Sequence, residues 1–358
     1  MGNSKLIYFV LGTKAQFIKS KHILIKLHEQ GYKVIIVNTN QHIEITKKQL
    51  HSLNFEFETF SLSKNKKNIS SVPSMILWFI KILKKIAIER PIVRKGYCLV
   101  HGDTVTTLIG LLFSKKNNLR CVHIESGLTS GNLLNPFPEE IVRRIVSKFS
   151  EILSIDNQEI LNNNLKLKNK KIILLKRNTI YDSIIENENI FSNEIQSKLI
   201  ITVHRTENIY SKERMTQLVN LIIELTEKLE FESIQWFCHD VTKKSLNKYN
   251  LMSKISKVVS IEELVSHEKF IGEIITSKLI ITDGGSIAEE CSILNKNTLI
   301  WRNTVENKEY LNQNVILTNY DKKVINKFIS NLKLTKMKKF HPYSPSEDFV
   351  NQLSLIKF

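Results

Sequence analysis

The order of short apolar runs and helical patterns is the feature that most constrains what this chain can fold into. Runs rich in β-branched and aromatic residues, such as 5–12, 33–39 and 97–101, are separated by longer stretches of helical periodicity, such as 15–30. Because the runs are apolar throughout, they are typical of parallel strands that are covered on both faces. The sequence therefore predicts an α/β fold with doubly wound parallel sheets.

The same alternation restarts near the middle of the chain, which predicts a second domain. New apolar runs begin at residue 198, and 358 residues are enough for two domains. We predict an N-terminal Rossmann-like domain over 1–174 and a C-terminal one over 175–340, facing a cleft, with 165–183 as the crossover. The segment 345–358 is expected to form a helix that packs back on the N-terminal domain.

The chain carries an excess of positive charge, which favours anionic partners. It has 52 Lys and Arg residues against 35 Asp and Glu residues, a formal net charge of +17. Such a balance favours nucleotides, nucleic acid or an acidic membrane face, although a general bias toward Lys, Asn and Ile would also produce it. No RNA- or DNA-binding motif is present, so we expect no nucleic-acid partner.

The cysteines and the N-terminus indicate a cytoplasmic protein. Cys98, Cys121, Cys238 and Cys291 form no CxxC pair, so neither a zinc site nor a redox motif is indicated. The first apolar run is short and leads into a glycine turn, as in a strand rather than a signal peptide. No stretch reaches the roughly 18 to 20 apolar residues that span a bilayer.

Segment 75–88 mixes apolar and aromatic residues with lysines. Trp78 and Phe79 lie close to Lys81 and Lys84, which is typical of a helix in a membrane interface with anionic lipid. An amphipathic helix packed on the sheet would show the same pattern. Peripheral contact with the inner membrane face is therefore one expectation, and burial of the apolar side in the core is the other.

Polar side chains follow one apolar run after another, at the ends where ligands bind in open α/β sheets. The positions are Gly12–Lys14, His101–Asp103, Glu125–Gly127, His204–Arg205 and Asp283–Gly285. A sheet that only had to fold would not need imidazoles and carboxylates at strand after strand. This regularity predicts an enzyme.

Three carboxylates are candidates for proton transfer. Asp103 and Glu125 end two neighbouring runs, and Glu139 follows a proline-stiffened loop. Crowded carboxylates raise one another's pKa, so that one can act as an acid while another acts as a base. Capping of a helix N-terminus is the alternative role for Asp103 and Glu139. Lys14 and Lys19 follow the first run; Lys19 could reach a ligand, or both could be ordinary surface lysines.

Segments 202–208 and 282–290 are candidates for binding a phosphorylated ligand. Arg205 could pair with phosphate in a bidentate fork, and His204 could donate to a diphosphate or move a proton. In 282–290 a glycine turn precedes a helix, whose N-terminus attracts anions. A capping cluster and a simple tight turn are the respective alternatives. The candidates in the turn and helix are Gly284, Gly285, Ser286 and Glu290.

Taken in order from Gly12 to Tyr310, these segments resemble the non-hydrolysing UDP-N-acetylglucosamine 2-epimerases, a family with a glycosyltransferase-B-type (GT-B) fold. GTKAQFIK is similar to the family's GTRPE-IK, HGDT to QGDT, and HIESGLTSG to HVEAGLRTG. PFPEEIVRR is similar to PWPEE-NR, VHRTEN to AHRREN, TDGGSIAEE to TDSGG-QEE, and NTVENKEYL to DTTERPEA. So many matches in sequence are highly specific.

The resemblance implies a reaction at C2 of a UDP-linked N-acetylhexosamine, for the synthesis of surface polysaccharide precursors. UDP is eliminated to give a glycal and is added back after the C2 proton returns on the other face. Asp103, Glu125 and Glu139 match the family's catalytic carboxylates, and His204 its catalytic or diphosphate-binding histidine. The implied substrate-binding positions are Lys14, Lys19, Arg205, His239, Gly284, Gly285, Ser286, Glu290 and Arg302. A UDP-sugar is the expected partner, with no metal and no cofactor.

The sequence departs from the family's motifs in the loops that would touch sugar and phosphate. Lys14 and Thr129 stand where the family has arginine, Gln16 stands where it has glutamate, and the glycine turn reads GGS instead of SGG. Lysine cannot reproduce the planar fork of arginine. Two alternatives therefore stay open, a GT-B glycosyltransferase at the membrane surface and a hydrolysing 2-epimerase. A homodimer is a further expectation.

Overall fold

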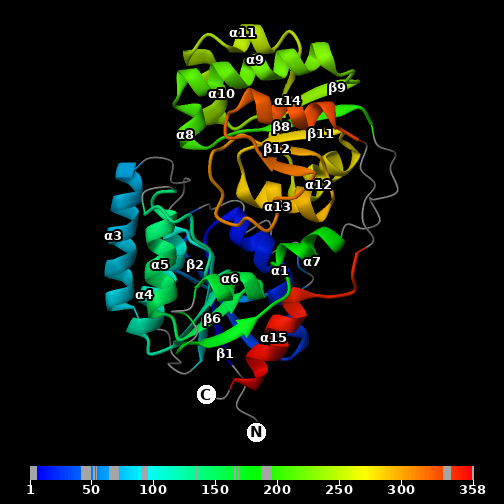
Figure 1. The fold of residues 1–358 in the computed structure, drawn as a ribbon. Coiled ribbons are helices and arrows are strands. Elements are labelled where there is room, and N and C mark those ends of the chain that lie inside the picture. Colours follow the sequence, from blue (N-terminus) through cyan, green and yellow to red (C-terminus); the bar gives the residue numbers. More distant parts are fainter. Residues whose placement is uncertain are drawn as a thin grey trace. The chain divides into compact units, whose positions relative to one another are not determined.

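The computed structural model describes residues 6–41, 50, 53, 55–63, 72–89, 96–133, 136–164, 167, 169–186, 196–333 and 340–356. The chain divides into two compact units, unit 1 (Met1–Ser183 with Pro342–Phe358) and unit 2 (Ile184–His341) (Figure 1). The division falls within helix α7 (Ile180–Ile185), whereas the sequence pattern predicts a boundary after residue 174.

Unit 1 is built on a parallel sheet of seven strands in the order β3-β2-β1-β4-β5-β6-β7. The strands are β1 (Leu6–Leu11), β2 (Lys33–Asn38), β3 (Glu58–Ser61), β4 (Tyr97–His101), β5 (Arg120–Ile124), β6 (Ile152–Ile155) and β7 (Lys171–Leu174). The strand order reverses between β1 and β4. The loops that follow these two strands therefore lie at the topological switch point, where open α/β sheets bind ligands.

Strand β1 divides the core of unit 1 into two layers. Ile7, Phe9 and Leu11 belong to the apolar cluster on one face of the sheet, and Tyr8 and Val10 to the cluster on the other. Successive side chains of a strand point to opposite faces, so a strand covered on both sides has no polar position. This is the physical reason for the unbroken apolar run in the sequence.

The helices of unit 1 are α1 (Lys14–Glu29), α3 (Val72–Ile88), α4 (Val105–Lys116), α5 (Glu139–Phe149), α6 (Gln158–Asn163) and α15 (Pro345–Leu355), together with the start of α7. Helix α15 comes from the end of the chain and contacts both α1 and β7 (Figure 1). The side-chain amide of Gln352 donates to the Leu174 carbonyl over 2.9 Å, and the Tyr97 hydroxyl donates to the Ile356 carbonyl over 2.8 Å. These bonds fasten the C-terminal segment to the first unit.

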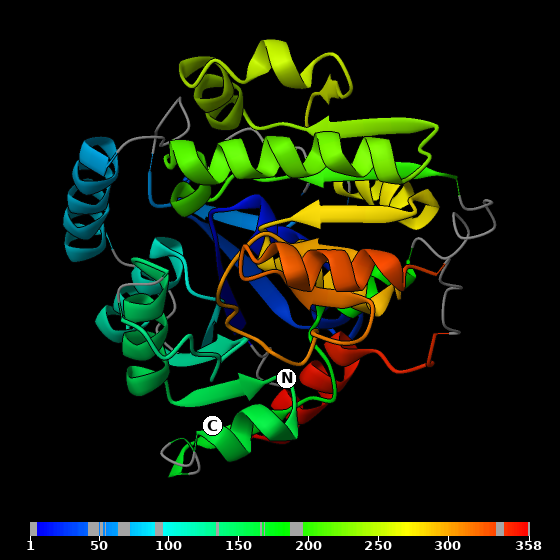
Figure 2. The same cartoon turned by 45° about the horizontal axis from the view of Figure 1, so that its top comes forward.

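Unit 2 is built on a parallel sheet of six strands in the order β10-β9-β8-β11-β12-β13 (Figure 2). The strands are β8 (Lys198–Thr202), β9 (Ser233–Phe237), β10 (Ser260–Glu262), β11 (Leu279–Thr282), β12 (Thr298–Ile300) and β13 (Val315–Leu317). The helices are α8 (Thr206–Ile209), α9 (Lys212–Lys228), α10 (Asp240–Lys248), α11 (Met252–Ile255), α12 (His267–Thr276), α13 (Gly285–Ile293) and α14 (Lys322–Ser330). Apolar clusters lie on both faces of this sheet, with Leu199 on one side and Ile200 on the other.

The prediction of an α/β fold with two parallel sheets is confirmed. All four cysteines are buried and free. Among the described residues, none of the helices is both long and apolar enough to cross a bilayer. The same part of the chain holds no cluster of three or more His, Cys, Asp or Glu side chains arranged to bind a metal ion.

Helix α3, which contains the lysine-rich apolar segment, has one buried and one exposed side. Trp78 and Ile82 are buried in the core of unit 1, and the Trp78 indole donates to the Thr39 carbonyl over 3.1 Å. Ile76 and Leu77 face solvent. Packing on the sheet, one of the two expectations for this segment, thus accounts for only part of its apolar surface.

Candidate active site

A buried cation holds a carboxylate at the carboxyl end of the unit 1 sheet. Glu125 directly follows β5, and its Oε1 accepts from the ammonium group of Lys19 in α1. The side-chain amide of Asn178 donates to the same oxygen over 2.9 Å. Because Lys19 and Asn178 are both buried, they fix the Glu125 carboxylate from two directions.

The backbone of Glu125 is strained. Its φ is 60°, in the left-handed region that side chains with a Cβ rarely adopt. Such conformations cost about 1 to 3 kcal/mol, cluster at functional sites and persist only where surrounding contacts hold them. The buried contacts to Lys19 and Asn178 are contacts of this kind.

The charges around Glu125 keep it ionised. Burial alone would raise its pKa, but Lys19 and His101 act in the opposite direction and lower the pKa of Glu125 to about 2. The Nδ1 atom of His101 lies 3.6 Å from Glu125 Oε2, and burial lowers the pKa of His101 to about 4. At neutral pH the carboxylate is therefore charged and the imidazole is neutral.

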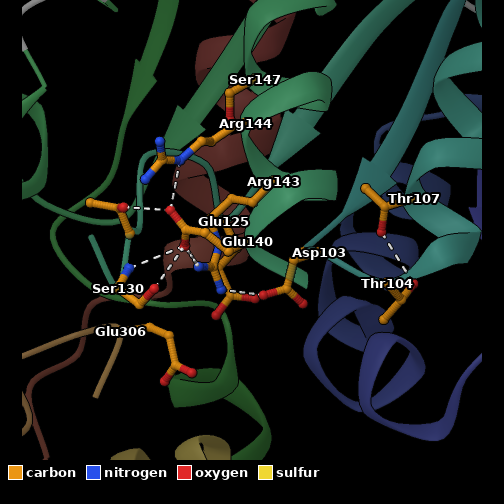
Figure 3. Close-up of polar contacts among 12 residues, drawn as sticks. Asp103, Thr104, Thr107, Glu125, Ser130, Glu140, Arg143, Arg144, Ser147 and Glu306 are labelled. Carbon is orange, nitrogen blue, oxygen red and sulfur yellow. Dashed lines mark hydrogen bonds and ion pairs between the residues drawn. The ribbon is translucent and has the colours of Figure 1, made fainter. Parts of the chain in front are cut away.

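Arg143 joins Asp103 to a second carboxylate (Figure 3). Its guanidinium donates to Asp103 Oδ2 and, over 2.8 Å, to Glu140 Oε2. Glu140 is fully buried and also accepts from Arg144 Nε over 2.8 Å and from the Thr129 hydroxyl over 2.6 Å. Burial would raise the pKa of Glu140, but these donors outweigh it and lower the pKa. Glu140 is thus the centre of a network that holds Arg143 against Asp103.

The structure does not give Asp103 and Glu139 the capping role that was their alternative. Thr104 occupies the N-cap position of α4, and Pro138 occupies that of α5. Glu139 is the first residue of α5 and is half-buried. It differs in environment from Glu140 because successive residues of a helix point about 100° apart.

Gln16, one of the departures from the family's motifs, ties two of the site's loops together. Its Oε1 accepts from the backbone N–H groups of Gly12 and Thr13 over 3.2 and 3.3 Å. Its amide donates to the His101 carbonyl over 2.9 Å. An ionised glutamate could accept in the same way but could not donate to that carbonyl. Lys14 is the first residue of α1 and is half-buried.

In unit 2, Asp283 organises the ends of β8 and β11. Its fully buried carboxylate accepts from the backbone N–H groups of His204 and Arg205 over 3.0 and 2.8 Å. It also accepts from the side-chain amide of Asn208 over 2.9 Å. The His204 ring contacts the His239 ring in a tilted arrangement, with ring centroids 4.6 Å apart and an angle of 36° between the ring planes. Three of the predicted residues thereby share the carboxyl end of this sheet.

The glycine turn opens helix α13 in the way the sequence predicts. Gly284 is the N-cap, Gly285 begins the helix and Ser286 follows, half-buried. A Cβ atom on Gly285 would lie 3.8 Å from Glu306 Oε2 and 3.9 Å from Arg205 Nη2. The first N–H groups of a helix have no partner within it, so the turn offers donors to an anion beside a guanidinium.

Arg302 binds carboxylates of its own unit. It is buried, and its two Nη atoms donate to the two oxygens of Glu306 over 3.1 Å each. Burial would raise the pKa of Glu306, but Arg302 and Arg205 lower it to about 2. The Arg302 Nε atom also lies 3.6 Å from Glu207 Oε1. In this arrangement Arg302 positions the Glu306 carboxylate beside Gly285 of the glycine turn.

Glu290 lies on α13, and its two carboxylate oxygens have different surroundings. Oε1 is 2.8 Å from the Nε2 atom of His267 in α12. Oε2 is buried and has no hydrogen-bond partner within the described residues. Buried acceptors of this kind normally have a donor, so the free oxygen is suited to a ligand hydroxyl.

Comparison with known proteins identifies the chain. Residues 25–350 match the family model described as UDP-N-acetylglucosamine 2-epimerase. The chain belongs to this family. A UDP-N-acetylglucosamine 2-epimerase of Methanococcus maripaludis is 30% identical, over 89% of this chain and 90% of the relative.

Solved structures of the 2-epimerase family also share the fold. The enzyme of Methanocaldococcus jannaschii, in complex with UDP-GlcNAc and UDP, is 28% identical with a TM-score of 0.81 over 98% of this chain and 99% of that one. The enzyme of Neisseria meningitidis, bound to UDP-GlcNAc, is 24% identical with a TM-score of 0.79 over 98% of each chain. These neighbours confirm the GT-B-type fold that the resemblance implied.

Several residues that position the side chains of the candidate 2-epimerase site were not among the predicted site residues. Arg143 follows Glu139 and Glu140 at helical spacings that favour ion pairs, which is a signal in the sequence. Asn178 gives no such signal, because its partner is 53 positions away. The sequence indicates Asp283 only as a polar residue after a strand. Its role as a hydrogen-bond acceptor depends on His204 and Arg205, which follow the neighbouring strand β8.

Proposed function

We propose that this protein epimerises C2 of a UDP-N-acetylhexosamine, of the UDP-GlcNAc to UDP-ManNAc type, for the synthesis of surface polysaccharide precursors. A base takes the C2 proton while the C1–O bond breaks, and UDP leaves with the electron pair. The resulting glycal takes a proton on the other face of C2, and UDP adds back at C1. The reaction needs a placed base, a placed acid and donors for the departing diphosphate.

The observation that carries this proposal is the placing of Glu125 and Asp103 after the adjacent strands β5 and β4, each held by a buried cation. Lys19 keeps Glu125 ionised, and Arg143 pairs with Asp103. In our proposal these two carboxylates and Glu139 carry the proton to and from the two faces of C2. A carboxylate with a fixed orientation is a better base than a mobile one, because it loses no freedom in the transition state.

We propose that unit 2 holds the UDP moiety. The N-terminus of α13, Arg205 and His204 would receive the diphosphate, since each offers N–H donors to an anion. His239 would support His204 through the contact between their rings. Glu290 would accept a ribose hydroxyl at its buried free oxygen. Of the remaining predicted positions in unit 2, Gly284, Gly285 and Ser286 would line the UDP moiety, and Arg302 would act through Glu306. Lys14, in unit 1, stays a predicted substrate-binding residue.

Proton NMR in heavy water tests the proposal. Purified protein is incubated with UDP-N-acetylglucosamine, and the C2 position is followed. Deuterium at C2 with UDP still attached is the expected result. Release of the free epimerised sugar would assign the hydrolysing reaction instead. An unchanged substrate, with UDP binding intact, would favour a glycosyltransferase.

We also propose that the exposed side of α3 contacts an anionic membrane surface, with the protein peripheral to the inner membrane face. Ile76 and Leu77 are 57% and 55% exposed, and Ile80 is 46% exposed. Lys81 and Lys84 are exposed beside them. Apolar side chains flanked by lysines on one side of a helix suit the boundary between acyl chains and anionic headgroups.

Vesicle sedimentation separates this contact from a homodimer. Wild-type protein should sediment with phosphatidylglycerol vesicles and not with phosphatidylcholine vesicles. A variant with Leu77→Gln and Ile80→Gln should stay in the supernatant, while Leu355→Gln, at a still more exposed position outside α3, should behave as wild type. If the double variant instead dissociates a dimer in sedimentation equilibrium and lipid has no effect, the face belongs to a second copy.

A further inference from the structure

Tyr310 has a buried hydroxyl that makes no hydrogen bond with the described residues. The residue is 6% exposed and belongs to an apolar cluster of unit 2. Its Oη atom has no hydrogen-bond partner within the described residues. Burying a hydroxyl without a hydrogen-bond partner is unfavourable, so such a group calls for an explanation.

The unpaired Tyr310 hydroxyl lies close to the start of helix α13. Tyr310 Oη would lie 3.9 Å from a Cβ atom on Gly285, at the same distance as Arg205 Nη2. Gly285 has no Cβ, and the open position is bordered by a phenol, a guanidinium, the first N–H groups of the helix and, at 3.8 Å, Glu306 Oε2. The Glu306 carboxylate already accepts from Arg302 through both of its oxygens, and the other groups are hydrogen-bond donors.

We propose that Tyr310 is a diphosphate-binding residue, whose phenol donates a hydrogen bond to a phosphate oxygen of the bound nucleotide at the N-terminus of α13. The proposal rests on the proposed UDP-binding role of unit 2. A ligand anion there would satisfy the buried hydroxyl, which gains a stronger bond to a charged acceptor than to a neutral one. Burial also raises the pKa of the Tyr310 phenol, so that it keeps its proton and remains a donor.

The residue pattern of the turn supports this role. The family's motif DTTERPEA has alanine at the position that Tyr310 occupies in NTVENKEYL, and TDSGG has serine at the position of Gly284. In this chain the hydroxyl of the turn lies at Ser286 instead of residue 284, and the segment after β12 adds another one at Tyr310. The Tyr310 hydroxyl is placed to supply the donor that the Gly284 position cannot.

Removal of the single oxygen tests the proposal. UDP binding to wild type, Tyr310→Phe and Tyr249→Phe is measured by calorimetry, together with each protein's thermal unfolding midpoint. The Tyr249 hydroxyl donates to the Tyr210 carbonyl at an exposed position, which makes Tyr249→Phe the matched control. Tyr310→Phe should weaken UDP binding about ten-fold, the usual effect of losing a bond to a charged group. Its unfolding midpoint should stay at or above the wild-type value, because no bond within the protein is lost.

The outcomes separate the inference from the function on which it rests. If wild-type protein does not bind UDP, the proposed function fails. If wild type binds UDP and Tyr310→Phe binds it equally well, only the role of Tyr310 is overturned. A lower unfolding midpoint with weaker binding would also overturn that role, since it would show that the hydroxyl serves the fold. Tyr249→Phe should leave the affinity unchanged.

Discussion

Lys19 and Glu125 form a buried ion pair although 106 positions separate them in the chain. One comes from the helix after β1 and the other from the loop after β5, so the pair joins two segments at the carboxyl end of one sheet. Breaking a buried pair leaves an uncompensated charge, which costs about 3 to 5 kcal/mol.

Lys19→Met should therefore lower the free energy of unfolding by about 3 kcal/mol. Lys26→Met is the control on the same helix, because Lys26 pairs with Glu29 at the surface, where such pairs contribute about 0 to 1 kcal/mol. Urea denaturation followed by circular dichroism measures both. Equal losses in the two variants would show that the Lys19 pair does not stabilise the fold.

Acid should destabilise the protein at a pH above the usual range of carboxylates. Burial lowers the pKa of His101 and His123 to about 4, from 6.5. Both imidazoles are neutral in the folded protein, so their contribution is complete above pH 6.5 and is lost as pH falls toward 4. The lowered pKa of Glu125, about 2 against 4.5, adds a further loss between pH 4.5 and 2.

Urea denaturation at a series of pH values checks this dependence. The unfolding free energy should fall between pH 6.5 and 4.5, by up to about 1.4 kcal/mol per pH unit for each buried histidine. His123→Phe removes one of the two groups and should reduce the slope by that amount, whatever it does to stability at pH 8. A slope identical to wild type would contradict the role assigned to His123.

Asp283→Ala should disrupt the proposed UDP-binding site of unit 2. The carboxylate accepts from His204, Arg205 and Asn208, and three unsatisfied donors in a buried position cost about 3 kcal/mol or more together. UDP binding should be lost along with stability. Asp283→Asn keeps one acceptor oxygen and should lie between this variant and wild type. Glu263→Ala, at an exposed position, should change stability by less than about 0.5 kcal/mol.

Glu139 and Glu140 should respond in opposite ways to the same substitution. Glu139→Gln should remove most turnover while changing stability by less than about 1 kcal/mol, because the amide keeps the shape of the side chain. Glu140→Gln should destabilise by about 2 to 3 kcal/mol, because Arg143 and Arg144 lose a charged acceptor. Turnover in heavy water and urea denaturation give the two readouts. Wild-type turnover in Glu139→Gln would remove Glu139 from the proton-transfer set.

The contrast between these two glutamates shows where sequence reasoning ends. The apolar runs predict the strands and their burial, and the polar residues after each run predict which edge of the sheet holds the site. Both inferences need only local periodicity. Whether Glu139 or Glu140 is fully buried depends on the rotation of α5 against the sheet, and two adjacent acidic residues carry no information about that angle.

Contacts between residues far apart in the chain are the other feature of the site that the sequence does not predict. Asn178 reaches Glu125 across the sheet, and Tyr310 faces Gly285 from a loop beyond β12. Neither residue type is unusual at its position, and no spacing rule links the members of each pair. The predicted residues follow the apolar runs or match the family's motifs, which indicates the position of each residue but not its partner.

Helix α15 makes the first unit discontinuous, since this helix from beyond residue 344 packs on α1, which begins at residue 14. During synthesis, the part of the protein that leaves the ribosome first is thus the part completed last, while unit 2 can finish folding from a continuous segment. A chain truncated shortly before residue 345 would lack α15 and would leave exposed the apolar surface that this helix covers on α1 and β7.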